Sequence, residues 1–273
     1  MLVLLPPSES KAEGGDGPPL RTRGLGPPAL ASARTTVLET VAQLCRDDPA
    51  AAAAALKLPA GLAGAALAAN IAALDAPTMP ALDRFTGVLY EALDAATLTP
   101  AQRAVADGVL VVMDGAFGAV RATEPLPDHR VPASAVLPGL GSVTAWWRTV
   151  LRGYLPLLVG HQPVLDLRST DYAAMWPVTG PLRRQVIPVR ILTAKGRGRS
   201  EVRRPLSYQA KVGKGRLVRA LLTAGAVTDG HDPSVTPARL AHAASDLAGG
   251  LGFRAVVRHG AADQLMLDLV GRA

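Results

Sequence analysis

The stretch Leu2-Val3-Leu4-Leu5-Pro6-Pro7-Ser8-Glu9-Ser10-Lys11 joins a short apolar run to four polar residues. The apolar run is typical of a buried β-strand, and the two prolines end it. Ligand sites in open α/β sheets lie beyond the carboxyl ends of strands, which is the place of this polar loop. Ser8 and Ser10 can hold a phosphate or carboxylate oxygen, and Lys11 can supply the counter-charge; the alternative is a polar surface turn. The glycine-rich cradle of a Walker loop is missing before Lys11.

A second apolar run, 163–167, is followed by the polar segment Arg168-Ser169-Thr170-Asp171-Tyr172. Arg168 can hold an oxyanion through two parallel hydrogen bonds. Ser169 is placed to cap the next helix, whose first amides favour an anion. Asp171 is either an ordinary residue of the helix start or a general base.

Outward from these two runs, short apolar strands alternate with helices, which predicts an α/β (or α+β) fold. We expect one compact domain over 1–273, with a central mixed sheet flanked by helices. The expected strands are 2–5, 109–113, 163–167, 185–192, 253–258 and 264–270, and 200–202 is a possible hairpin partner for 185–192. The expected helices are 27–46, 56–74, 81–93, 100–106 (ended by Gly108), 142–151 (capped by Ser142), 211–224 and 236–248. Residues 114–121 read as a turn region.

Composition bounds the class of protein. The chain has 273 residues, of which 49% are hydrophobic, so it can bury a sizeable core. Its only cysteine, Cys45, cannot form an internal disulfide, which fits a reducing compartment and a cytoplasmic protein. No run approaches the ~20 apolar residues of a membrane span. No Cys/His spacing indicates a zinc site, and we predict no metal and no cofactor.

The net charge of +7 and a basic stretch from Arg183 to Arg219 point to an anionic partner. Residues 195–199, Lys-Gly-Arg-Gly-Arg, read as an exposed hairpin tip whose cations suit phosphate backbones. The alternative is a solvated charged hairpin. The turn-rich connector 225–233 then separates two helices, which could form an element like a helix–hairpin–helix. The candidate DNA contacts are Lys195, Arg197, Arg199, Lys211, Lys214, Arg216 and Arg219.

Seven segments carry motifs in a fixed order: the opening 2–11, residues 85–93 (F-T-G-V-L-Y-E-A-L), residues 114–121 (D-G-A-F-G-A-V-R), Asp128-His129-Arg130, Trp147, residues 166–172 (D-L-R-S-T-D-Y) and 208–219 from Tyr208 to Arg219. In this order they resemble the YaaA family of bacterial peroxide-stress proteins. The chain departs from the family pattern at four positions: Arg168 replaces a small residue, Asp171 replaces a glutamate, and Glu9 and Ser10 stand where Ala and Lys are usual. These changes fall in polar loops and bear on the ligand more than on the fold.

The resemblance implies a role in limiting hydrogen peroxide damage and binding to duplex or branched DNA. The first hypothesis is therefore a DNA-binding stress protein, for which the basic stretch should form one exposed face. The second is an enzyme acting on a small anionic or nucleobase-like molecule, in which Glu9, Lys11 or Asp171 would do the chemistry. Its pocket would be formed by the loops after 2–5 and 163–167 and lined by Ser8, Ser10, Arg130, Arg168, Ser169, Tyr172 and Lys211.

Overall fold

The computed structural model describes residues 1–195, 202–205, 207–228 and 234–272, and within them eight strands form one mixed sheet. The strands run β11-β12-β9-β8-β1-β3-β4, and β10 pairs with β9. Their bounds are β1 (Leu2–Leu5), β3 (Leu110–Asp114), β4 (Gly118–Arg121), β8 (Val164–Asp166), β9 (Val186–Lys195), β10 (Val202–Pro205), β11 (Arg254–His259) and β12 (Leu265–Arg272). Two small ladders pair β2 (Met79–Pro80) with β5 (Pro125–Leu126) and β6 (Val136–Leu137) with β7 (Gly141–Ser142). The predicted mixed α/β sheet is confirmed.

The middle of the sheet is parallel. Strand β1 lies between β3 and β8, and Val3 is opposite both Leu110 and Leu165. Every residue of β1 and of β3 is buried. A strand covered on both faces needs apolar side chains on both, which explains its continuous apolar run. The carboxyl ends of β1, β3 and β8 therefore meet at one edge of the sheet.

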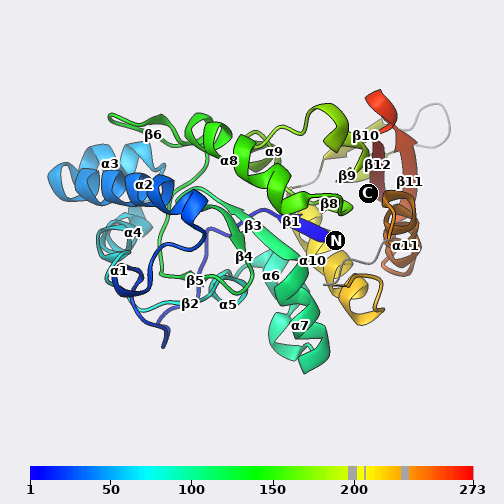
Figure 1. The fold of residues 1–273 in the computed structure, drawn as a ribbon, viewed down its shortest axis with the longest axis horizontal. Coiled ribbons are helices and arrows are strands. Elements are labelled where there is room, and N and C mark those ends of the chain that lie inside the picture. The colour runs from blue at the N-terminus through cyan, green and yellow to red at the C-terminus, as the bar shows by residue number, and fades with distance from the viewer. Residues whose placement is uncertain (196–201, 206, 229–233, 273) are drawn as a thin grey trace.

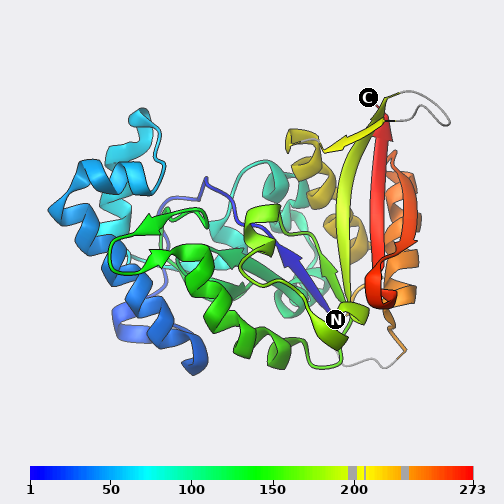
Figure 2. The ribbon, with the colours of Figure 1, turned by 90° about the horizontal axis from the view of Figure 1, so that it is seen from above.

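Helices cover both faces of the sheet, and a further group of helices lies beyond one end of it. Their bounds are α1 (Leu20–Arg23), α2 (Pro28–Asp47), α3 (Pro49–Ala55), α4 (Ala60–Ala72), α5 (Ala81–Arg84), α6 (Val88–Leu93), α7 (Pro100–Val109), α8 (Val143–Val159), α9 (Thr170–Ala173), α10 (Ser207–Thr223) and α11 (Pro237–Gly250). Short 3-10 segments are η1 (Ala95–Thr97), η2 (Gly180–Arg184) and η4 (Ala261–Asp263). Helices α2, α3 and α4 lie at one end of the molecule, and α11 with β11 at the other (Figure 1). Figure 2 shows α8 along one side of the strands.

Several boundaries differ from those expected. The helix expected over 56–74 begins only at Ala60 and ends at Ala72, and the helix expected over 142–151 continues to Val159. Helix α7 continues through Gly108 to Val109, because its amino end is fixed by a capping box between Thr99 and Gln102 and a single glycine is tolerated near its end. Residues 114–121 are not only a turn: Gly118–Arg121 returns as β4, antiparallel to β3. The predicted cap of α8 is confirmed, since the Ser142 hydroxyl accepts a hydrogen bond from the amide of Ala145 at 3.3 Å.

The single helix expected over 81–93 is two helices, α5 and α6. The break occurs at Gly87, whose φ of 87° is in the left-handed region that suits glycine. Phe85 next to the break forms an isolated antiparallel bridge with Lys11. The amide of Thr86 also donates to the carbonyl of Ser10 at 3.1 Å. The break thus holds the loop after β1 in place and positions Lys11.

Two fully buried arginines connect helices α2 and α5 to neighbouring strands and loops through hydrogen bonds. Arg34 on α2 donates to the carbonyls of Phe117 (2.8 Å) and Ala119 (2.6 Å) and to Glu124 (2.6 Å), which fastens α2 to β4. Arg84 on α5 donates to the carbonyl of Leu126 at 3.1 Å and reaches into the loop after β1. There it donates to the carbonyls of Ala12 and, at 2.8 Å, Gly14.

Candidate functional site

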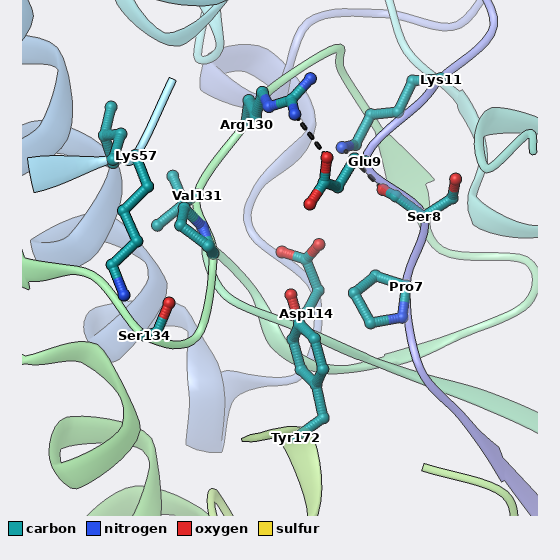
Figure 3. A pocket seen from close by; sticks show the side chains of 12 residues that line it. Pro7, Ser8, Glu9, Lys11, Lys57, Asp114, Arg130, Val131, Ser134 and Tyr172 are labelled. Atoms are coloured by element: carbon teal, nitrogen blue, oxygen red, sulfur yellow. Dashed lines mark hydrogen bonds and ion pairs between the residues drawn. The ribbon is translucent and has the colours of Figure 1, made fainter. Parts of the chain in front are cut away.

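An open pocket of about 140 Å³ lies beyond the carboxyl ends of β1, β3 and β8 (Figure 3). Its walls come from five separate parts of the chain: the loop after β1, the end of β3, the loop 130–134, the turn between α3 and α4, and helix α9, which follows β8 and contributes Tyr172. The lining residues are Pro7, Ser8, Glu9, Lys11, Leu56, Lys57, Asp114, Arg130, Val131, Pro132, Ser134 and Tyr172.

Lys11 is a half-buried cation of the pocket. Its Nζ donates to the carbonyl of Ser8 at 3.4 Å and lies 5.5 Å from the centre of the Phe85 ring. Burial lowers the pKa of Lys11 below its usual value, and the charge of Asp114 partly opposes that shift. A lysine with a lowered pKa has a larger neutral fraction near neutral pH, so it can accept a proton.

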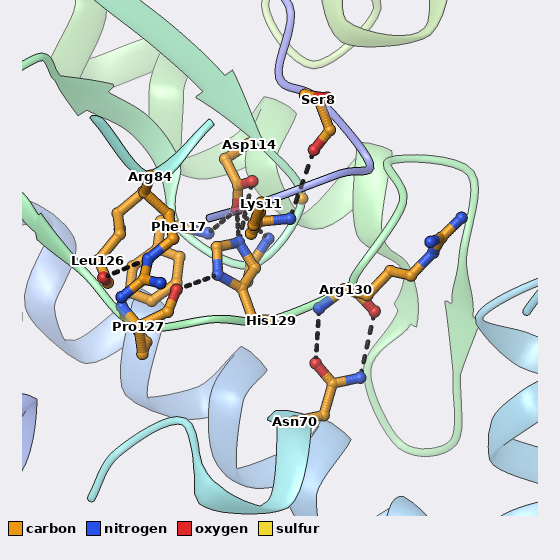
Figure 4. A network of polar contacts seen from close by, with 12 residues as sticks. Ser8, Lys11, Asn70, Arg84, Asp114, Phe117, Leu126, Pro127, His129 and Arg130 are labelled. Carbon is orange, nitrogen blue, oxygen red and sulfur yellow. Dashed lines mark hydrogen bonds and ion pairs between the residues drawn. The ribbon is translucent and has the colours of Figure 1, made fainter. Parts of the chain in front are cut away.

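Asp114 and His129 form a buried pair at the pocket (Figure 4). Nε2 of His129 lies 3.0 Å from Oδ2 of Asp114, and Nδ1 lies 3.1 Å from the carbonyl oxygen of Pro127. Both ring nitrogens face oxygen acceptors, so making both hydrogen bonds requires a proton on each. Oδ1 of Asp114 also accepts from the amides of Ala116 (2.8 Å) and Phe117 (3.0 Å).

The environment keeps Asp114 ionised. Burial would raise its pKa, but the charges of His129 and Lys11 and the hydrogen bonds from His129 and Ala116 outweigh burial and lower the pKa to about 2. The hydroxyl of Tyr172 faces the same carboxylate in Figure 3. Burial, together with the charge of Asp114, raises the pKa of Tyr172 above its usual value, so this hydroxyl stays protonated and can donate.

Arg130 is held at both its backbone and its side chain. Asn70 on α4 clamps the backbone: its Oδ1 accepts from the Arg130 amide at 2.8 Å, and its Nδ2 donates to the Arg130 carbonyl at 3.1 Å. The guanidinium donates to Glu9 at 2.5 Å across the mouth of the pocket. Glu9 is 79% exposed and Arg130 only 18% exposed. This ion pair joins the loop after β1 to the loop 130–134.

The structure brings together some of the residues predicted from the sequence. Ser8, Glu9, Lys11, Arg130 and Tyr172 line the pocket. The predicted residues Ser10, Arg168, Ser169, Asp171 and Lys211 are not among the lining residues.

The predicted oxyanion ligand Arg168 is turned inward instead. It is buried and donates to both oxygens of Asp166, at 2.8 and 2.7 Å, and to the carbonyl of Trp176 at 3.1 Å. Its guanidinium also lies 5.3 Å from the centre of the Trp176 ring. Arg168 thus holds the end of β8. Ser169 is at the expected cap position of α9, but its side chain makes no capping hydrogen bond, and both Ser169 and Asp171 are exposed.

Two of the candidate DNA contacts, Lys214 and Arg219, also make hydrogen bonds within the protein. Nζ of Lys214 donates to the carbonyls of Leu167 (2.6 Å) and Arg168 (3.1 Å), and burial lowers its pKa to about 8. Arg219 donates to the carbonyls of Leu93 (3.1 Å) and Asp94 (2.5 Å). Both cations therefore bind α10 to neighbouring elements.

Lys211 and Arg216 are exposed on α10. Arg197 and Arg199, together with the side chain of Lys195, lie outside the described residues, as does 229–233 of the connector between α10 and α11.

Sequence reasoning missed five residues of the site: Lys57, Asn70, Asp114, His129 and Ser134. The signal for Asp114 was present, because it follows the apolar run 109–113 as Ser8 follows 2–5. Asn70 and His129 meet partners 60 and 15 positions away in the chain, which no local spacing reveals.

Among the described residues, no group of three or more His, Cys, Asp and Glu side chains is arranged to hold a metal ion. No single helix in the described ranges has both the length and the apolarity to cross a membrane. The pair α3 and α4 meets those criteria only when the two are taken together, across a 104° bend.

The fold and the site define an α/β protein with a charged, open pocket at the carboxyl edge of a mixed sheet. A family model described as peroxide stress protein YaaA matches residues 1–230, and the chain belongs to this family. A UPF0246 protein of Streptomyces coelicolor is 42% identical over 90% of this chain and 90% of its own length. A UPF0246 protein of Corynebacterium efficiens is 34% identical over 98% of this chain and 99% of its own. The resemblance to the YaaA family is thereby confirmed.

Proposed function

We propose that this member of the peroxide stress family acts on a small anionic or nucleobase-like molecule bound in the pocket. The observation that carries the proposal is the convergence of Lys11, Asp114, Arg130 and Tyr172 from four segments into one open pocket. Such a concave site, with few polar groups directed inward and titratable groups of shifted pKa, is typical of an active site.

The residues divide the chemistry between them. Lys11, with its lowered pKa, is the group that transfers a proton. Asp114 stays ionised and does not titrate near neutral pH, so it accepts hydrogen bonds from the ligand and stabilises positive charge. Tyr172 donates a hydrogen bond from its protonated hydroxyl. Glu9 is paired with Arg130, and Asp171 is exposed outside the pocket, which leaves Lys11 as the proton carrier.

A thermal-shift screen of nucleobases, nucleotides, inorganic phosphate and small carboxylates tests this proposal. The wild-type chain should be stabilised by at least one compound class, and Lys11→Met and Arg130→Ala should lose that stabilisation. Lys211→Ala is the control, because it removes one charge from an exposed site outside the pocket. If compounds stabilise wild type and Lys11→Met equally, the pocket is not where they act and the proposal fails.

DNA binding is the second candidate, and the exposed cations Lys211 and Arg216 on α10 favour it together with the net charge of +7. Affinity for a labelled duplex should then fall steeply with salt. The triple variant Lys195→Ala/Arg197→Ala/Arg199→Ala should lose both affinity and salt slope. Survival of peroxide by a complemented deletion strain separates the two candidates. Loss of rescue by Lys11→Met alone supports the pocket, and loss by the triple variant alone supports DNA.

A further inference from the structure

The turn between α3 and α4 carries the pocket's one residue with a backbone conformation that side chains rarely adopt. Lys57 has a φ of 55°. The turn closes α3 with two hydrogen bonds, from the amide of Lys57 to the carbonyl of Ala54 (3.1 Å) and from Leu58 to Ala53 (2.9 Å). This arrangement ends many helices, and its left-handed position is usually glycine. A lysine there keeps a strained backbone, and such strain persists at sites where it serves a function.

Lys57 is the cation of the pocket whose Nζ makes no hydrogen bond or ion pair within the described residues. Three cations line it: Lys11, Lys57 and Arg130. Lys11 donates to Ser8, and Arg130 is paired with Glu9. Lys57 is exposed, and among the described residues no hydrogen bond or ion pair engages its Nζ. The carboxylate of Asp114 is already matched by His129. The pocket therefore keeps an uncompensated ammonium on one wall.

The polar side chains of the pocket lie on two opposite sides. Figure 3 shows Lys57 and Ser134 on the side opposite Ser8, Glu9 and Lys11, with Asp114 and Tyr172 between. The hydroxyl of Ser134 is exposed and can donate to an oxygen held by Lys57. The Lys57–Ser134 side thus suits an oxyanion, whereas the Asp114 side suits a hydrogen-bond donor.

We infer that Lys57 and Ser134 form the anion subsite of the pocket and bind a phosphate or carboxylate group of the ligand. This inference rests on the proposed function and specifies its ligand: one end carries the oxyanion, and the other end donates hydrogen bonds to Asp114. The left-handed turn directs the ammonium of Lys57 into the pocket, and buried Leu56 anchors the turn beside it.

The inference is tested by titrating the isotope-labelled full chain with inorganic phosphate, and separately with succinate, at constant ionic strength. Backbone amide signals of Lys57, Leu58 and Ser134 should shift saturably. Removing one exposed ammonium from an anion contact weakens binding by about fivefold. Lys57→Gly and Lys57→Met should therefore each raise the dissociation constant about fivefold, whereas Lys211→Ala should leave it unchanged.

The two Lys57 variants separate charge from backbone. Lys57→Gly relieves the strained φ, so its thermal midpoint should equal or exceed that of the wild type while anion affinity falls. Lys57→Met keeps a side chain at the strained position and loses only the charge. Unchanged affinity in both variants, or a marked drop in the midpoint of Lys57→Gly, overturns the inference.

The same titration distinguishes a wrong anion subsite from a wrong proposed function. If amides of Ser8, Lys11 and Tyr172 shift saturably while those of Lys57 and Ser134 do not, the pocket binds the anion but the assigned subsite is wrong. If no amide of the pocket shifts with phosphate or succinate, the anion subsite is wrong, and the proposed function is wrong as well only if no nucleobase or nucleotide stabilises the wild-type chain in the thermal-shift screen. A response to phosphate alone or to succinate alone identifies which oxyanion the ligand carries.

Discussion

Nε2 of His129 lies 3.0 Å from Oδ2 of Asp114, and both side chains are almost completely buried. A buried pair of opposite charges is stable only while both partners are present, because a lone charge in the interior has no solvent to balance it. Phe117 packs its ring against that of His129 at a centroid distance of 4.9 Å, and Arg34 donates to the Phe117 carbonyl. The pocket carboxylate is therefore supported from α2 through the core.

Replacing His129 with Ala should lower the free energy of unfolding by about 3 kcal/mol, since it leaves the buried Asp114 carboxylate without its ion-pair partner while the amides of Ala116 and Phe117 still donate to it. Chemical denaturation followed by circular dichroism measures this loss. The control is His242→Ala, which alters an exposed histidine on α11 and should change stability by less than about 0.5 kcal/mol. A loss in His129→Ala no larger than in the control would show that the pair is not a buried ion pair in solution.

The pH dependence of stability should report on Asp114. Its folded pKa of about 2 lies below the ordinary value of 3.8, so its contribution is present above pH 4 and is lost as the pH falls towards 2. The shift corresponds to about 2 kcal/mol. Asp114→Asn should remove this part of the acid dependence, and Asp171→Asn, at an exposed site, should retain it. Identical acid profiles for wild type and Asp114→Asn would contradict the assignment.

Asn70→Ala should weaken ligand binding without removing any pocket side chain. Asn70 fixes the backbone of Arg130 through two hydrogen bonds, at 2.8 and 3.1 Å, and its loss leaves both backbone groups unpaired. We expect a stability loss of about 1–3 kcal/mol. Asn70→Asp can still accept from the Arg130 amide but cannot donate to its carbonyl, so it should show an intermediate loss. Calorimetric titration with whichever compound the thermal screen identifies measures the binding. Full affinity in Asn70→Ala would show that the clamp does not position Arg130.

Arg34→Lys should lower the free energy of unfolding nearly as much as Arg34→Met. The planar guanidinium donates to three backbone carbonyls and to Glu124, and a lysine ammonium cannot match that fork. We expect a loss of about 3–5 kcal/mol for Arg34→Met, measured as the shift in denaturation midpoint. Arg46→Lys, on the exposed end of α2, is the control. A stable Arg34→Lys would mean that charge alone, rather than the fork, holds α2 on β4.

Lys214→Met should destabilise the chain but leave any DNA binding unchanged. Its Nζ donates hydrogen bonds to the carbonyls of Leu167 and Arg168. Leaving these carbonyls unpaired should lower the free energy of unfolding by about 1–3 kcal/mol. Arg216→Ala, by contrast, should reduce the salt slope of duplex binding by about one, with little effect on stability. Gel-shift titrations across a salt series distinguish the two. A lower salt slope of duplex binding in Lys214→Met would show that the Lys214 ammonium contacts the DNA phosphates.

The sequence predicted the strands well because an apolar run depends only on neighbouring residues, whereas the glycines at 87 and 108 did not show where helices break. The strands 2–5 and 163–167 and the loop after the first of them were found by a rule that depends only on neighbouring residues. The same rule did not reveal that Arg168 turns inward, where it donates to both oxygens of Asp166 and to the carbonyl of Trp176. Lys57 was invisible because a left-handed turn is normally signalled by glycine, and here the chain has lysine.

The turn that carries Lys57 belongs to the alanine-rich helices and not to the sheet. The other walls of the pocket come from segments beside the sheet edge, where a substitution also disturbs buried strands or the His129–Asp114 pair. The wall that carries Lys57 is a surface turn closed by its own backbone. Under the proposed anion subsite, a substitution at position 57 would therefore change anion binding while Lys11 and Asp114 keep their contacts. The alanine-rich segment would then contribute to ligand selection without contributing to the sheet.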